Sequence, residues 1–89
     1  MRVLSKRSWP VIIIDILDAA LKPTNKMRLM YKSNLNFERF NKYLNDLLKK
    51  NFIEEINSSK GNRTYKTTER GKTLLNALRN AQKLVSSTP

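Results

Sequence analysis

The 89-residue sequence predicts a mainly α-helical domain with one small β-hairpin, in the order helix, helix, helix, strand, strand, helix. Apolar residues recur at helical spacing before residue 51 and after residue 67. Between these segments, two short runs of strand-forming residues flank a polar turn that contains Gly61. A chain of this length makes one domain with a small core, because it buries only about 60–65% of the surface of its unfolded chain.

The first helix is predicted to run from Trp9 to about Leu21. Ser8 is a suitable N-cap, Pro10 is tolerated in the first turn, and Pro23 ends the helix because it disfavours helical backbone at the residue before it. Apolar residues occupy most of the circumference, which is more than one buried face requires. A second face is therefore expected to contact another element or another chain.

A short second helix is predicted to begin at residue 24 or 25 and to end near residue 32. Its apolar side chains are expected to face the core at least in part. They are Met27, Met30 and Tyr31. A polar turn at residues 33–36 then leads into the third helix.

The third helix is predicted from Phe37 to Lys50, with Asn36 as its N-cap. Its apolar residues follow the i, i+3, i+7 pattern of one buried stripe, so the aromatic residues among them are expected to belong to the core. The stripe consists of Phe37, Phe40, Leu44, Leu47 and Leu48. Asn51 follows the helix, at a position where a left-handed residue is expected.

Residues 52–57 and 63–67 are predicted to form the two strands of a hairpin, because both are rich in strand-forming residues. Gly61 supplies the positive φ that the intervening turn needs. Thr68 is placed to cap a last helix over residues 68–85, with Glu69 in its first turn. An apolar stripe recurs along that helix, and it comprises Leu74, Leu78, Ala81 and Val85.

The predicted domain covers residues 8–85, between a flexible basic arm at 1–7 and a frayed tail at 86–89. Eighteen Lys and Arg residues oppose seven Asp and Glu residues, which gives a net charge of +11. Such a charge favours a polyanionic partner, above all nucleic acid, although an anionic membrane surface would also attract it.

Cysteine and histidine are both missing from the sequence, which excludes disulfides, zinc knuckles, thiolate nucleophiles and imidazole bases. Glu54 and Glu55 are adjacent on a predicted strand and point to opposite faces, so they cannot form a carboxylate pair. We therefore expect no enzyme activity, cofactor or metal. The apolar stretch 11–17 contains Asp15 and is far shorter than the ~20 residues of a membrane span. No signal peptide is expected either, and the expected location is the cytoplasm, in association with the nucleoid.

This order of elements is that of a winged helix, in which the third helix is exposed on one side and the hairpin lies beside it as a wing. The exposed face carries cations and amides, which pair with guanine and adenine in the major groove. The residues predicted to contact DNA from this helix are Asn36, Glu38, Arg39, Lys42, Asn45 and Lys49. Glu38 and Asp46 repel phosphate, but they can accept hydrogen bonds from cytosine N4. The alternative is an ordinary solvated face.

Further basic and polar residues flank this helix and are expected to contact phosphates or the minor groove. They are Lys26, Arg28, Lys32, Ser33, Lys60, Asn62, Arg63 and Lys66. For the residues of the wing, a turn that serves only solubility is an equal alternative.

Several short motifs follow one another between residues 11 and 78. They are MRLMYKSNLNF at 27–37, Lys42-Tyr43-Leu44, Leu47, Asn51-Phe52-Ile53, and the pattern Y-x-x-T-x-x-G at Tyr65, Thr68 and Gly71. In this order they resemble the small archaeal winged helix–turn–helix proteins, which include single-domain transcriptional regulators and a chromatin-associated DNA-binding protein. The resemblance implies duplex DNA as the partner. Met27 departs from it, because the family usually has a capping Thr there.

A homodimer is also expected, although the last helix is shorter than the antiparallel helix of the chromatin-associated relative. Its predicted interface consists of Leu74, Leu78, Ala81 and Val85, with help from the first helix. The alternative is that these residues close the core of their own monomer. The predicted function is sequence-specific binding of double-stranded DNA by a transcriptional regulator. An architectural DNA-coating protein and a protein-interaction winged helix are the alternatives.

Overall fold

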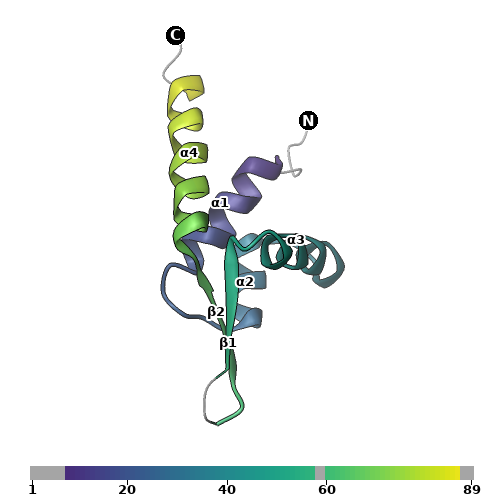
Figure 1. Ribbon diagram of the computed structural model, residues 1–89. Coiled ribbons are helices and arrows are strands. Elements are labelled where there is room, and N and C mark those ends of the chain that lie inside the picture. Colours follow the sequence, from purple (N-terminus) through teal and green to yellow (C-terminus); the bar gives the residue numbers. More distant parts are fainter. Residues whose placement is uncertain (1–7, 58–59, 87–89) are drawn as a thin grey trace.

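A computed structural model of the chain describes residues 8–57 and 60–86. Its elements, in chain order, are α1 (Trp9–Ala19), α2 (Lys26–Ser33), α3 (Phe37–Lys49), β1 (Ile53–Asn57), β2 (Arg63–Thr67) and α4 (Glu69–Ser86) (Figure 1). The predicted fold class and element order are confirmed. Ser86, predicted to begin the tail, is instead the last residue of α4. The predictions for the arm at 1–7 and for residues 87–89 lie outside the described residues.

The hydrophobic core is built around α1, which contacts α2, α4 and β2. Ile12, Ile16 and Leu17 are fully buried. The other core residues come from every remaining element, and they are Ala20, Leu29, Phe40, Leu44, Leu47, Ile53, Tyr65 and Leu75. The additional contact face predicted for the first helix is therefore covered, in large part, by the same chain.

α1 ends two residues before its predicted end, because β2 binds the carbonyl groups at its C-terminus. The Thr67 backbone N–H donates to the Ala20 carbonyl at 2.8 Å, and its hydroxyl donates to the Leu17 carbonyl at 2.7 Å. Beside them, Thr24 and Tyr65 exchange two backbone hydrogen bonds of 3.1 and 2.7 Å. These contacts attach the base of the hairpin to the helices.

β1 and β2 pair in antiparallel register, with Ile53 opposite Thr67 and Asn57 opposite Arg63. Gly61 has a φ of 80°, as predicted for the turn. The hairpin extends away from the helices as a wing (Figure 1). Only its base is buried, since Ile53, Tyr65 and Thr67 belong to the interior.

Asparagine side chains fix the starts of α2 and α3. The Asn25 side chain accepts a hydrogen bond from the Arg28 backbone N–H at 2.8 Å, and Asn36 accepts one from the Arg39 backbone N–H at 2.9 Å. Asn25 thus supplies the cap that the family resemblance placed two residues later. Asn51 has the predicted left-handed conformation, with a φ of 64°.

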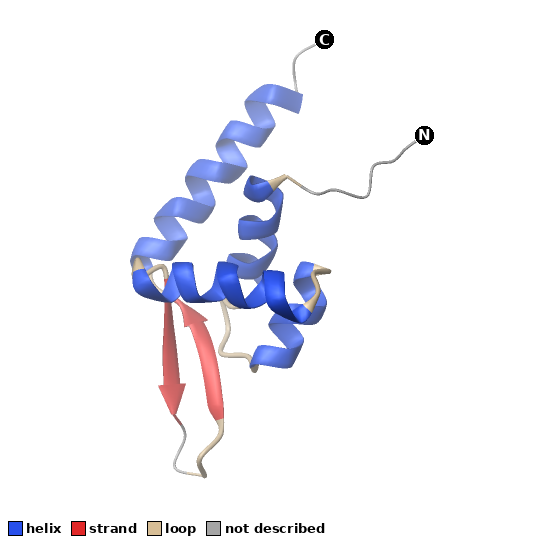
Figure 2. Cartoon of the chain, turned by 90° about the vertical axis from the view of Figure 1, so that its right-hand side faces the viewer, coloured by secondary structure: helices blue, strands red, loops and turns tan. Residues whose placement is uncertain are grey.

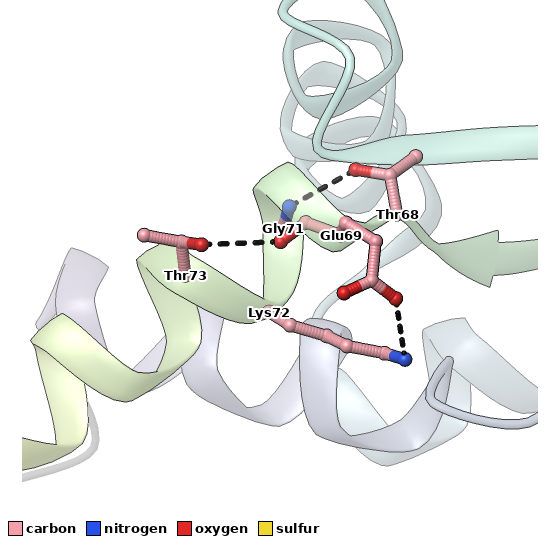
Figure 3. Close-up of polar contacts among 5 residues, drawn as sticks. All are labelled: Thr68, Glu69, Gly71, Lys72 and Thr73. Atoms are coloured by element: carbon pink, nitrogen blue, oxygen red, sulfur yellow. Dashed lines mark hydrogen bonds and ion pairs between the residues drawn. The ribbon is translucent and has the colours of Figure 1, made fainter.

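Contacts of Thr68 and Gly71 connect the start of α4 to the segment that follows α3; Figure 3 shows these two residues. The Thr68 hydroxyl oxygen accepts from the Gly71 backbone N–H at 2.9 Å and donates to the Asn51 carbonyl at 2.6 Å. Gly71 is buried, and a Cβ atom there would lie 2.1 Å from the Phe52 carbonyl oxygen. The Thr and Gly of the sequence pattern therefore act as a helix cap and as a point of close backbone approach.

Three apolar side chains that were predicted to face the core are exposed instead. They are Met27, Tyr31 and Phe37, with exposed fractions of 68%, 83% and 60%. α2 buries only Leu29 and Ser33, so its buried stripe is one residue wide. Phe37 lies one turn before the buried Phe40, beyond the edge of the core.

α4 packs against the body at its beginning and extends beyond it at its end (Figure 1). Leu75 is buried, whereas Leu84 and Val85 are 74% and 76% exposed. An ion pair between Arg79 and Asp18 links α4 to α1. None of the described helices is both long and apolar enough to cross a membrane.

Candidate nucleic-acid interface

The outer face of α3 is open to solvent along its length of about 20 Å. Its exposed residues are Glu38, Arg39, Lys42, Asn45, Asp46 and Lys49, opposite the buried Phe40, Leu44 and Leu47. Figure 2 shows α3 running across the side of the molecule that faces the viewer, with no described element in front of it. The structure therefore brings the predicted residues of this helix together on one accessible face.

The cations of this face are available for a ligand. Within the described part of the chain, no carboxylate lies within ion-pairing distance of Arg39, Lys42 or Lys49. Asp46, which would repel phosphate, pairs with Lys50 at 3.2 Å. Because this pair is exposed, it holds the two side chains only weakly, but it offsets the acidic charge.

Asn36 lies at the edge of this face and caps the N-terminus of α3. Its side-chain oxygen accepts a hydrogen bond from the Arg39 backbone N–H, so that oxygen is already used in capping α3. The cap fixes the first turn of the helix, which presents Arg39.

α2 contributes Arg28 and Lys32, and both are exposed as predicted. Lys26 is half-buried, with its ammonium 5.3 Å from the centre of the Phe37 ring. The prediction for Ser33 is wrong. This residue is fully buried, and its hydroxyl donates to the Met30 carbonyl at 2.7 Å, so it cannot contact a phosphate on the surface.

The wing has a mixed charge. Lys60, Asn62 and Arg63 are exposed and Lys66 is half-buried, but Arg63 pairs with Glu55 at 3.3 Å. Burial raises the pKa of the Tyr65 hydroxyl, and the negative charge of the same glutamate adds to the shift, so this tyrosine is neutral at physiological pH. Support for DNA contacts is therefore weaker at the wing than at α3.

A cavity of about 500 Å³ lies between the start of α2 and the wing. It is lined by Pro23, Thr24, Asn25, Arg28, Asn62, Arg63 and Thr64. Two arginines from separate elements thus line one concave surface, and the guanidinium fork matches the geometry of phosphate oxygens.

One feature of this surface was not predicted from the sequence, the contact of the Lys26 ammonium with the Phe37 ring. The apolar periodicity of the third helix assigned Phe37 to the core, whereas its ring is exposed. Its place directly after the N-cap could have revealed this, because the first residue of a helix often lies beyond the element that covers the rest of the stripe.

The predicted dimer surface is partly covered by its own subunit. Leu74 packs against the core, and Leu78 is half-buried, whereas Ala81 and Val85 are exposed. A cavity of about 640 Å³ between α1 and the end of α4 is lined by Ser8, Trp9, Pro10, Leu78, Ala81, Gln82 and Val85. Trp9 is 59% exposed there, so an apolar surface remains without a cover in the described chain.

Comparison with known proteins supports the resemblance predicted from the sequence. An uncharacterized protein of Methanocaldococcus jannaschii is 32% identical over 85 residues, which cover 94% of this chain and 82% of that protein. The crystal structure of Sso10a-2, described as a DNA-binding protein from Sulfolobus solfataricus, matches with a TM-score of 0.81 and 25% identity, over 91% of this chain and 84% of that one.

The PcaV transcriptional regulator of Streptomyces coelicolor matches with a TM-score of 0.65 over 98% of this chain and 67% of that one. At 13% identity, this likeness shows the fold alone. Neither solved structure is described as that of an enzyme. The winged helix-turn-helix family model matches residues 6–86, nearly the whole sequence, and the chain belongs to this family.

Proposed function

We propose that the protein binds double-stranded DNA by placing α3 in the major groove, and that it regulates transcription through a sequence preference. The observation that carries the proposal is the exposed face of α3, where Asn45 lies beside Arg39 and Lys42, two cations that form no ion pair with any other described residue. These side chains donate to guanine or pair with adenine at base edges. The likeness to Sso10a-2, described as a DNA-binding protein, supports the same function.

Cations around α3 would position the protein on the DNA backbone. Arg28 and Arg63 line the cavity between α2 and the wing, where a phosphate can be reached from two elements at once. The net charge of +11 supplies the long-range attraction. The proposed phosphate contacts are Lys26, Arg28, Lys32, Lys60, Arg63 and Lys66.

The salt dependence of duplex binding tests this proposal. Six phosphate contacts should give log K a slope of about −5 per protomer against log salt concentration, since each contact contributes about −0.9. The measurement is a titration of labelled duplexes by fluorescence anisotropy at several salt concentrations. Absence of duplex binding at physiological salt would contradict the proposal and would favour a protein-interaction domain.

Selection of bound duplexes from a random pool separates two roles of the same interface. A sharp sequence motif supports a regulator that contacts bases through α3. A flat profile with the same salt slope assigns an architectural role, in which counterion release drives the binding. Running the selection at two salt concentrations separates the base contacts from the backbone contacts.

The proposed active form is a homodimer joined through the end of α4 and the start of α1. The exposed Ala81, Leu84 and Val85 and the nearby Trp9 support this arrangement, because they would leave water on association. Two copies of α3 spaced by one helical turn of DNA, about 34 Å, would contact a palindromic site.

The Val85→Asp variant is expected to weaken the dimer by about 2 kcal/mol, or about 30-fold, because an unpaired carboxylate would enter an apolar contact. Analytical ultracentrifugation over a range of protein concentrations measures this shift. Asn76→Asp is the matched control, since it adds the same charge to an exposed position on the opposite side of α4. A parent protein that is monomeric at all concentrations would refute the dimer.

A further inference from the structure

Phe37 is a large aromatic side chain in an unusual place. It is the first residue of α3 and is 60% exposed, whereas Phe40 in the next turn is fully buried. The ammonium of Lys26, from the start of α2, adjoins its ring. An exposed ring buries little apolar surface in the free protein, and it is therefore available to contact a ligand in a complex.

The ring is held at a defined position. The Lys26 ammonium lies 5.3 Å from the ring centre, within the range of a cation–π interaction. The backbone of the same turn is fixed by the Asn36 cap, whose side-chain oxygen accepts from the Arg39 N–H at 2.9 Å. Phe37 is therefore presented by a capped helix and by a neighbouring helix, not by a loop.

We propose that Phe37 is a specificity-determining residue that packs against the 5-methyl group of a thymine in the major groove, with Lys26 contacting a nearby phosphate. This inference rests on the proposed binding of duplex DNA by α3. The N-terminal residues of a recognition helix are those that reach base edges. Thymine presents the one methyl group of the major groove, and phenylalanine is among the residues that contact it.

The surrounding charge favours DNA as the occupant of this apolar spot. Lys26 adjoins the ring, and the two helices that carry Lys26 and Phe37 also carry four exposed cations, which are Arg28 and Lys32 on α2 and Arg39 and Lys42 on α3. A protein partner that covered the ring would have to supply several carboxylates at the same time, whereas duplex DNA supplies phosphates on both sides of the groove. The ring and the cations thus match one ligand that is apolar at the thymine methyl and anionic at its backbone.

The test uses two duplexes that differ only in the thymine methyl group. One is a short alternating dA–dT duplex, and the other has uracil in place of every thymine, so that a methyl is present or absent in every binding register. The parent protein is expected to bind the uracil duplex about fourfold more weakly, the equivalent of about 0.8 kcal/mol for one methyl group removed from water. Phe37→Ala should bind both duplexes equally, and more weakly than the parent binds the thymine duplex.

Two controls make the comparison specific to Phe37. Tyr31→Ala removes an aromatic ring that is 83% exposed on α2, and it should keep the preference for thymine. Circular dichroism and thermal unfolding should show an intact fold for both variants, because both side chains are mostly exposed. The cycle of two proteins and two duplexes cancels any difference in duplex stiffness that uracil introduces.

The outcomes distinguish this inference from the proposed function. Equal binding of both duplexes by the parent protein would overturn the role of Phe37 and leave DNA binding by α3 intact. Loss of the thymine preference in Tyr31→Ala, or its retention in Phe37→Ala, would also overturn it. Failure to bind any duplex, including the mixed-sequence pool, would instead refute the proposed function itself.

Discussion

Replacing Gly71 by alanine is expected to lower the free energy of unfolding by about 3 kcal/mol, at the upper end of what overpacking of a tight site costs. The added Cβ would lie 2.1 Å from the Phe52 carbonyl oxygen and 2.7 Å from Thr67 Cγ2. The first of these neighbours is backbone, so the clash can be relieved only if α4 moves away from the start of β1. For a domain of this size, the expected fall in Tm is about 12–24 °C.

Helix propensity alone predicts the opposite change in the free energy of unfolding for this substitution. Alanine is favoured over glycine by about 1 kcal/mol inside a helix, so without the clash the substitution would stabilise α4. Thermal and urea unfolding measure the change. Asn76→Ala, at an exposed position of the same helix, is the control and should be neutral or slightly stabilising. A Gly71→Ala variant as stable as the parent would contradict the close approach between α4 and Phe52.

Local patterns were sufficient to predict most of the fold. Asn36 and Thr68 were identified as N-caps because a short polar side chain before an amphipathic stretch has one favoured use, and both accept a backbone hydrogen bond at that position. Asn51 was predicted to be left-handed because it directly follows the end of the third helix, and its φ is 64°. The exposed face of α3 followed from the same period of 3.6 residues that defined its buried stripe.

The remaining features depend on contacts between distant parts of the chain. The end of α1 is set by hydrogen bonds from Thr67, about 50 residues away, and no pattern within α1 encodes it. Ser33 is polar and lies at a predicted turn, yet it completes the last turn of α2 and is buried. Phe37 fits the apolar period of α3, but it lies beyond the edge of the core. Periodicity identifies the apolar face of a helix, whereas the position of the neighbouring elements decides which residues of that face are buried.

The double variant Arg39→Ala and Lys42→Ala is expected to lose specific DNA binding by about 2–6 kcal/mol, at least about 30-fold, because each of the two proposed base contacts is worth about 1–3 kcal/mol. Both residues are exposed on α3 and support no described hydrogen bond or ion pair through their side chains. The fold should therefore be unchanged, and thermal unfolding checks this point. Binding is measured by anisotropy on the duplex recovered from the random pool.

A control variant separates the effect of losing two positive charges from the effect of losing them on α3. Lys22→Ala and Lys83→Ala together remove the same two positive charges from exposed sites outside α3. This control should lose only the weak, long-range part of the attraction, which fades as salt screens it. If the two double variants lose equal affinity, base recognition by α3 is refuted and the protein binds DNA only through its overall charge. If the α3 variant alone falls to the affinity measured on unrelated duplexes, the specificity resides on the face formed between Asn36 and Lys49, which carries the side chains proposed to contact base edges.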